Sequence, residues 1–165
     1  MTLEVRLAHP DEHVDAGRVT AAAYEEFVRP EDDAWREYLE RIADVAERAD
    51  RTDVLVALED GRILGSATLE LDGRTEAEDG PLGPSEAHIR MLGVDPGARK
   101  RGVGRALMNA CEDRARDAGR THMTLHTTER MRDAQRMYEH LGYVRGADRT
   151  FPDGFVLMSY AKDLG

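Results

Sequence analysis

The chain has 165 residues, with 33 acidic and 23 basic side chains and a formal net charge of -10. This length is typical of one domain, so we expect a single domain over residues 1–165. Because a protein that coats nucleic acid needs a basic surface, the acidic balance argues against a nucleic-acid partner.

The hydrophobic pattern of the first half predicts a strand, two helices and a β-hairpin. Apolar residues alternate in the strand and recur at helical spacing in both helices, more cleanly in the second. Asp60-Gly61 separates the hairpin strands and supplies the positive φ angles of a tight turn. These elements are expected at residues 3–7, 14–27, 35–49, 54–59 and 63–71.

The second half begins with a surface loop at residues 72–85, which contain glycine and proline without an apolar period. Strands and helices then alternate before two final strands. The order indicates an α/β (α+β) domain with a mixed, mostly antiparallel sheet of about six or seven strands and about four helices. These later elements are expected at residues 87–94, 104–118, 123–127, 131–141, 143–145 and 155–161.

The turn after the strand at 87–94 carries the strongest chemical signal. Gly102 precedes the next helix and Gly104 begins it, and there unpaired N–H groups and the absence of a Cβ suit a bound anion. Residues 86–165 carry 14 bases and 11 acids, whereas residues 1–85 carry 9 bases and 22 acids. The densest basic run lies in this turn and consists of Arg99, Lys100, Arg101 and Arg105.

Two familiar nucleotide loops do not fit this turn. Gly97 and Gly102 have P-loop spacing, but Val103 and Gly104 stand where that loop needs lysine and serine or threonine. A dinucleotide fingerprint would need a glycine in place of Leu107. Taken alone, the glycines also allow a plain turn with a solvated basic surface.

Two segments together identify a family. Val94-Asp95-Pro96 precedes Arg99-Lys100-Arg101-Gly102-Val103-Gly104, and Tyr138 precedes Leu141-Gly142-Tyr143 about thirty residues later. The first resembles the turn, written Gln/Arg-x-x-Gly-x-Gly/Ala, of the GNAT superfamily of acyl-CoA-dependent N-acyltransferases, and the second resembles its tyrosine helix. The order of elements is similar over residues 3–162.

The resemblance implies an N-acetyltransferase that moves the acetyl group of acetyl-CoA directly to a primary amine of a small molecule or peptide, without a metal. It places the pyrophosphate on the turn and the pantetheine arm along the preceding strand. Many members have an asparagine where this chain has Met131, so that pantetheine contact is in doubt. The implied cofactor-binding residues are Leu92, Gly93, Val94, Arg99, Lys100, Arg101, Gly102, Val103, Gly104 and Arg105.

For catalysis, the resemblance implies that Tyr138 is the acid that protonates the leaving sulfur. Its helical spacing also fits a core position, which is the alternative interpretation. His88 is expected as the base, because imidazole titrates near neutrality. By strand alternation it shares a face with Glu86, Arg90 and Leu92, so Glu86 or a water chain are alternatives. His122, His126 and His140 are interpreted as ordinary histidines.

In the family, residues 25–33 and 148–155 correspond to the segments that recognise the amine. The first is acidic and could attract a cationic amine, although a solvated helix face and N-cap is the favoured interpretation. A polyamine, an aminoglycoside-like molecule, an amino acid and a protein N-terminus all stay open. The alternative function is a non-catalytic acyl-CoA-binding sensor or interaction domain, and a homodimer is possible.

Cellular location follows from absent signals. Cys111 is the only cysteine, which excludes an intrachain disulfide and a cysteine-based metal cluster. The chain lacks about 18 consecutive apolar residues, and its first residues do not resemble a signal peptide. We therefore expect a cytoplasmic protein without a membrane partner.

Overall fold

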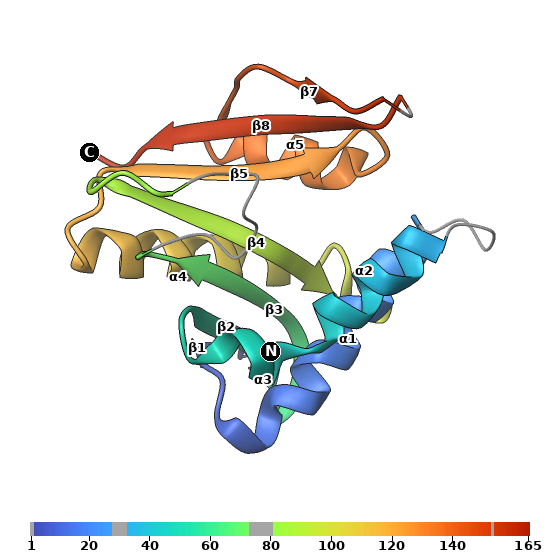
Figure 1. Cartoon of the computed structure of the whole chain (residues 1–165). Helices are drawn as coiled ribbons and strands as arrows, with labels where there is room; N and C mark the ends of the chain where they lie inside the picture. Colours follow the sequence, from blue (N-terminus) through green and yellow to red (C-terminus); the bar gives the residue numbers. More distant parts are fainter. Residues whose placement is uncertain (1, 28–32, 73–80, 153) are drawn as a thin grey trace.

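The computed structural model describes residues 2–27, 33–72, 81–152 and 154–165. The helices and strands follow one another along the chain in nearly the predicted order (Figure 1). In chain order the elements are β1 Glu4–Leu7, the 3-10 turn Pro10–Glu12, α1 His13–Glu25, α2 Asp33–Ala43, α3 Val45–Ala49, β2 Asp53–Glu59, β3 Arg62–Glu70, β4 Glu86–Val94, the 3-10 turn Pro96–Ala98, α4 Val103–Asp117, β5 His122–Thr128, α5 Arg132–His140, β6 Val144–Arg145, β7 Arg149–Thr150 and β8 Val156–Asp163.

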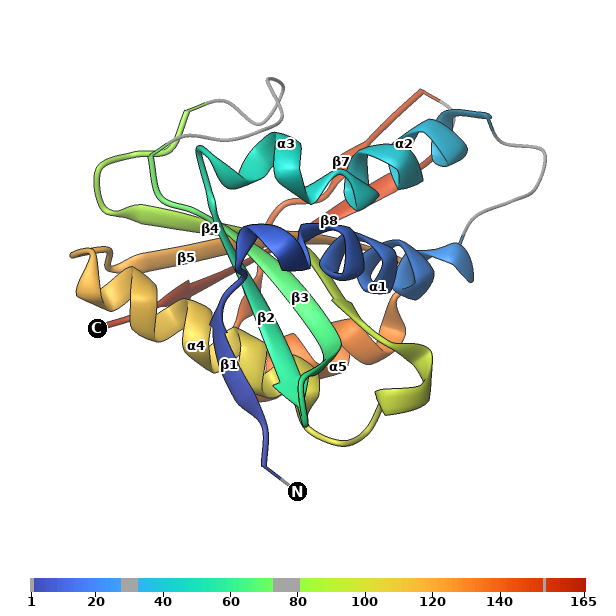
Figure 2. The same cartoon turned by 90° about the horizontal axis from the view of Figure 1, so that it is seen from below.

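The described strands form one eight-stranded sheet in the order β1-β2-β3-β4-β5-β8-β6, with β7 also paired to β8. Every pair is antiparallel except β4 with β5, which α4 connects. Helices α1, α2 and α3 lie on one side of the sheet, and α4 and α5 lie on the other (Figure 2). The expected mixed α/β fold is confirmed, with slightly more strands than predicted.

The sheet separates two hydrophobic cores. Leu55 and Ala57 of β2 belong to the larger core, which α4 and α5 cover. Val54 and Val56 belong to the smaller core with Ala16 of α1. Burial on both faces explains why β2 is a continuous apolar run without polar alternation.

The predicted hairpin forms at the predicted turn. Asp60 and Gly61 have φ angles of 51° and 79°, as a two-residue turn of this hand requires. Glu59 pairs with Arg62 directly across it. The turn fixes the pairing next to it, and a register shift between Ala57 and Leu58 changes the pairing along the rest of the hairpin.

The second predicted helix is in fact two helices. α2 ends at Ala43, and the Asp44 side chain accepts a hydrogen bond from the Glu47 N–H at 3.2 Å and so begins α3. Arg48, 2% exposed, donates to the carbonyl oxygens of Arg41 and Ile42 at the end of α2, at 3.0 and 2.8 Å. The apolar periodicity continues from α2 into α3, so the sequence pattern does not show where one helix ends and the next begins. The sequence pattern also missed β7, which is only two residues long.

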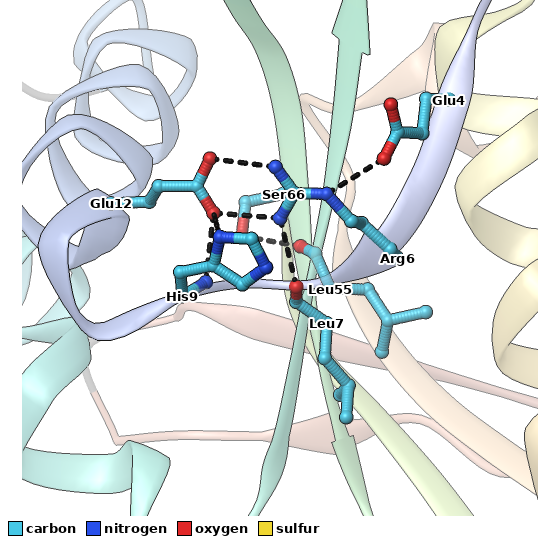
Figure 3. A network of polar contacts seen from close by, with 7 residues as sticks. All are labelled: Glu4, Arg6, Leu7, His9, Glu12, Leu55 and Ser66. Atoms are coloured by element: carbon cyan, nitrogen blue, oxygen red, sulfur yellow. Dashed lines mark hydrogen bonds and ion pairs between the residues drawn. The ribbon is translucent and has the colours of Figure 1, made fainter. Parts of the chain in front are cut away.

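A polar network connects β1 to the start of α1 (Figure 3). The Arg6 guanidinium donates to both oxygens of Glu12 at 2.7 and 2.9 Å, and to Glu4 at 2.8 Å. Glu12 also accepts from the His9 N–H at 2.7 Å. The bonds from Arg6 lower the pKa of Glu12 to about 2.

Among the described helices, none is both long enough and apolar enough to cross a membrane.

Candidate active site

The site lies where β4 and β5 separate. These parallel strands pair only from Glu86 and His122 as far as Ile89 and Leu125, although both strands continue beyond that point. Figure 1 shows them diverging toward their carboxyl ends. The backbone of β4 after Ile89 therefore offers N–H and C=O groups on the edge that faces β5.

A β-bulge bends β4 away from its neighbour. Thr68 pairs with Arg90 and Ser66 with Gly93, so that Met91 and Leu92 both stand opposite a single β3 residue. Met91 has a φ angle of 56°, which is uncommon for a side chain of this kind. The bulge is the local cause of the separation.

The bulge also changes which side chains share a face. Leu92 packs against the larger core, whereas a Cβ on Gly93 would lie 3.1 Å from Ala23 of α1. The expectation that Leu92 shares the face of His88 is therefore wrong, because simple alternation stops at Met91.

Two pockets open on the diverging strands. The α2 pocket, about 610 Å³, is lined by β4 residues 88–91, by α2 and by the segment from β7 to β8. The α4 groove, about 690 Å³, is lined by β4 residues 92–94, by the turn before α4 and by α5. Four residues line both: Tyr24, His126, Thr127 and Met131. The two spaces therefore adjoin at the point where β5 leaves β4.

The turn that enters α4 has the backbone of an anion site. Lys100 and Gly102 have left-handed φ angles of 63° and 81°, and nothing lies within 4 Å of a Cβ built on Gly102. The first N–H groups of α4 have no carbonyl one turn earlier to bind. Gly104 has a different role, which is to let α4 pack closely on α5. A Cβ built at this position would lie 3.1 Å from the Met137 sulfur of α5.

The four basic side chains of the turn take different positions. Arg101 binds both oxygens of Glu59, at 3.0 and 2.8 Å, and does not line the groove. Arg99 lines it but also forms an ion pair with Glu26. Lys100 and Arg105 line the groove, and neither has an ion-pair or hydrogen-bond partner among the residues that the structure describes. The remaining predicted cofactor residues, at 92–94 and 102–104, all line the groove.

Tyr138 lies in the core and at the groove at once. It is 5% exposed, and its ring centroid is 5.8 Å from Tyr160 and 6.1 Å from Tyr143. It also lines the α4 groove, and within the described chain its hydroxyl has no hydrogen-bond partner. Burial raises the pKa of this phenol well above its usual range, which keeps it protonated.

His88 and His126 face each other across the diverging strands. Their ring centroids are 5.1 Å apart, and the Nδ1 atom of His88 is 2.7 Å from the Thr124 hydroxyl. His88, 1% exposed, lines only the α2 pocket, whereas His126 is half-buried and lines both spaces. Glu86, the alternative base, is not a described lining residue of either space.

Sequence reasoning missed several of these positions. The interpretation of His126 as an ordinary histidine does not anticipate its place at the junction of the two spaces. Three further arginines around the start of α5 line the α4 groove: Arg130, Arg132 and Arg136. Their close spacing in the sequence is a signal that could have marked them as part of an anion-binding groove. Met131 occupies that junction too, and its sulfur accepts a hydrogen bond from the Thr127 hydroxyl at 3.5 Å.

Comparison with known families decides the membership of the chain. The model of the acetyltransferase (GNAT) family matches residues 18–143, which include the turn and Tyr138. The chain belongs to this family. The resemblance found in its motifs is confirmed.

Two curated relatives of this GNAT chain are named for small-molecule chemistry. A mycothiol acetyltransferase of Cellulomonas flavigena is 35% identical over 59% of this chain and 28% of its own length. An S-(2-succino)cysteine N-acetyltransferase of Bacillus subtilis is 32% identical over 64% of this chain and 63% of its own length. The chain thus spans less than two thirds of either relative.

Solved structures share the fold. A protein of Salmonella typhimurium, described as an acetyltransferase and solved with its cofactor acetyl-CoA, superposes with a TM-score of 0.72 at 20% identity. The match covers 100% of this chain and 95% of that one. At this identity the likeness concerns the fold.

Proposed function

We propose that this GNAT chain transfers the acetyl group of acetyl-CoA to a primary amine. The observation that supports this most is the meeting of two spaces at Tyr24, His126, Thr127 and Met131. One space has an anion-binding turn, and the other has room for a small molecule. A reaction between two ligands needs such an open junction.

The residues of the α4 groove fit acetyl-CoA. Lys100, Arg105 and the first N–H groups of α4 hold the pyrophosphate, and the open edge of β4 at 92–94 pairs with the pantetheine amides. The bound thioester supplies the activated acetyl group. Arg101 is outside this binding set, because Glu59 holds it on the other side of the turn.

The proton transfers fall to three side chains. His88 and His126 together accept the proton of the incoming ammonium group, His126 being the member at the junction. Tyr138 donates a proton to the departing sulfur, and its raised pKa keeps that proton available. No step requires a metal.

The relatives' names support a small-molecule amine as acceptor rather than a peptide. A cytoplasmic location and a homodimer stay predictions from sequence. A non-catalytic acyl-CoA sensor is the second candidate, supported only by the independence of fold and function.

Thermal unfolding with acetyl-CoA or ATP, followed by thiol release with a panel of amines, tests the proposal. A ligand at 100 times its Kd adds about 2.7 kcal/mol, so acetyl-CoA is expected to raise Tm by about 5–10 °C and ATP is not. Thiol release that depends on an amine supports transfer. Binding without release from any amine supports the sensor, and no shift with any CoA ester contradicts both.

A matched pair of variants tests the groove. Arg105→Gln is expected to weaken acetyl-CoA binding about tenfold, through loss of a charge-assisted contact. Arg101→Gln, in the same turn but bound to Glu59, is expected to change the Kd by less than about twofold. Isothermal titration measures both, and equal effects would contradict this assignment.

A further inference from the structure

We propose that Tyr24 is a further catalytic residue, whose hydroxyl donates a hydrogen bond to the acetyl carbonyl oxygen during transfer. The inference rests on the proposed acetyl transfer and assigns a task that His88, His126 and Tyr138 leave open. Attack by the amine forms a C–N bond at the carbonyl carbon and moves an electron pair onto the carbonyl oxygen. That oxygen needs a hydrogen-bond donor until the C–S bond breaks and the pair leaves with the sulfur.

The end of α1 lies at the place where the two spaces adjoin. Tyr24, one residue before the last residue of α1, lines both the α2 pocket and the α4 groove. α1 packs directly on β4 here, because a Cβ built on Gly93 would lie 3.1 Å from the Ala23 Cβ and 3.1 Å from the Thr20 Cα. Tyr24 follows Ala23 in the chain and therefore lies beside the part of β4 that no longer pairs with β5.

Two contacts from the α4 groove hold this end of α1 in place. The Arg99 guanidinium donates to the Ala23 carbonyl oxygen at 3.4 Å. Arg130, which precedes α5, donates to the Phe27 carbonyl oxygen at 3.0 Å. Tyr24 lies between these two attachment points in the sequence. Its backbone is thus fixed before a ligand binds, which is the preorganisation that stabilisation of an oxyanion requires.

The chemistry of the four residues that line both spaces favours Tyr24 as the donor. The Met131 side chain has no N–H or O–H group, and the Thr127 hydroxyl donates to the Met131 sulfur at 3.5 Å. His126 has the proposed task of accepting the ammonium proton. The Tyr24 hydroxyl has no hydrogen-bond partner within the described chain, so a bound carbonyl oxygen can become its acceptor.

The Tyr24 hydroxyl also keeps its proton. Burial raises its pKa well above the usual range of a phenol, and the charges of Tyr38 and Tyr138 act in the same direction. A neutral phenol donates a hydrogen bond, whereas a phenolate would repel an oxygen that gains negative charge. Tyr24 retains its proton throughout the reaction, and in this respect it differs from Tyr138, which gives its proton to the sulfur.

The backbone of β4 is the alternative donor. Beyond Ile89 its N–H groups on the edge that faces β5 are not paired with that strand. Substitution separates the two possibilities, because Tyr24→Phe removes the hydroxyl and leaves the backbone of β4 in place. The lost hydroxyl has no partner within the described chain, so the variant should keep the wild-type fold and Tm.

Infrared spectroscopy of bound acetyl-CoA tests the contact without turnover. A hydrogen bond to a carbonyl oxygen weakens the C=O bond and lowers its stretching frequency. With acetyl-CoA isotope-labelled at the carbonyl carbon, we expect the bound band at a higher frequency in Tyr24→Phe than in the wild type. Tyr138→Phe should leave the band in place, because the sulfur is the proposed partner of that phenol. CoA has no acetyl group and should bind Tyr24→Phe with a Kd within about twofold of the wild-type value.

Steady-state kinetics tests the catalytic role with the fastest amine of the panel. Tyr24→Phe should lower kcat about 100-fold, which is the usual effect of removing one oxyanion donor. Tyr160→Phe is the matched control, because its hydroxyl donates to Glu139 at 3.1 Å and Tyr160 is not a described lining residue of either space. This control should leave the infrared band in place and change kcat by less than about twofold.

Each failure has its own signature. A Tyr24→Phe protein with the wild-type band and kcat overturns the inference, assigns the oxygen to the β4 backbone alone and leaves the acetyltransferase intact. A lower kcat with an unchanged band also overturns it, because Tyr24 would then act elsewhere than at the carbonyl. Absence of thiol release with every amine overturns the proposed function and the catalytic role with it, whatever the infrared band shows.

Discussion

At the scale of single residues, Tyr138 packs in the hydrophobic core and also borders the α4 groove. Its ring packs against Tyr143 and Tyr160, while the residue borders the α4 groove. Helical periodicity alone favoured a core position, and the family resemblance favoured a catalytic one. The core position is confirmed, and the catalytic role stays a prediction that the place of this residue at the groove allows.

Replacing the hydroxyl alone separates these roles. Tyr138→Phe keeps the packed ring, so we expect an unchanged fold and acetyl-CoA Kd but a kcat about 100-fold lower, within the range of general acid catalysis. Because burial raises the Tyr138 pKa, the wild-type kcat should show no alkaline loss from this group up to about pH 10. Steady-state kinetics across pH measures both.

Tyr143→Phe is the matched control. Its hydroxyl donates to buried Glu112 at 2.8 Å, and Tyr143 is not a described lining residue of either space. It should lower stability and leave kcat unchanged. A Tyr138→Phe enzyme with wild-type kcat at every pH would remove the phenol from the mechanism.

At the scale of elements, the position of α2 decides the shape of the α2 pocket. Arg48 holds its carboxyl end, and Gly17 of α1 lets it approach closely. A Cβ on Gly17 would lie 2.0 Å from the Ala43 carbonyl oxygen. α2 in turn carries Trp35, Tyr38 and Arg41 into the pocket. The contact between α1 and α2 thus determines where these three side chains lie in the α2 pocket.

In Gly17→Ala, helix propensity and packing change the free energy of unfolding in opposite directions. Propensity alone would stabilise α1 by about 1 kcal/mol, but the overlap with backbone should prevail and lower the free energy of unfolding by about 1–3 kcal/mol. Chemical denaturation gives the sign. We also expect KM for the acceptor to rise while the Kd of acetyl-CoA stays the same. A more stable variant would show that α1 and α2 are not in this close contact.

At the scale of the whole molecule, stability depends on joining the first strand to the rest of the domain. β1 pairs with β2 at the sheet edge, and the bonds from Arg6 to Glu12 connect it to α1 (Figure 3). The pKa of Glu12 is lowered from 4.5 to about 2 by this contact. Its ionised form is therefore favoured in the folded protein relative to the unfolded chain.

The stabilisation from Glu12 is fully present above about pH 5 and is lost as pH falls toward about 2. Glu12→Gln should lower Tm at pH 7 by up to about 3 °C, with the difference from wild type shrinking in acid. Calorimetry at several pH values measures this. A difference that stays constant with pH would mean that Glu12 acts through packing.

The sequence by itself determined the features that local patterns encode. Periodicity and turn chemistry predicted the mixed α/β fold and the Asp60-Gly61 hairpin, and two spaced motifs identified the family and the turn before α4. The tertiary structure decided the rest. Arg101 binds Glu59, which is 42 residues away in the sequence. Arg41, Arg90 and Arg149 line one pocket from three different elements. Such pairings depend on how the bulge and the helix contacts bring distant segments together, and no local pattern records that.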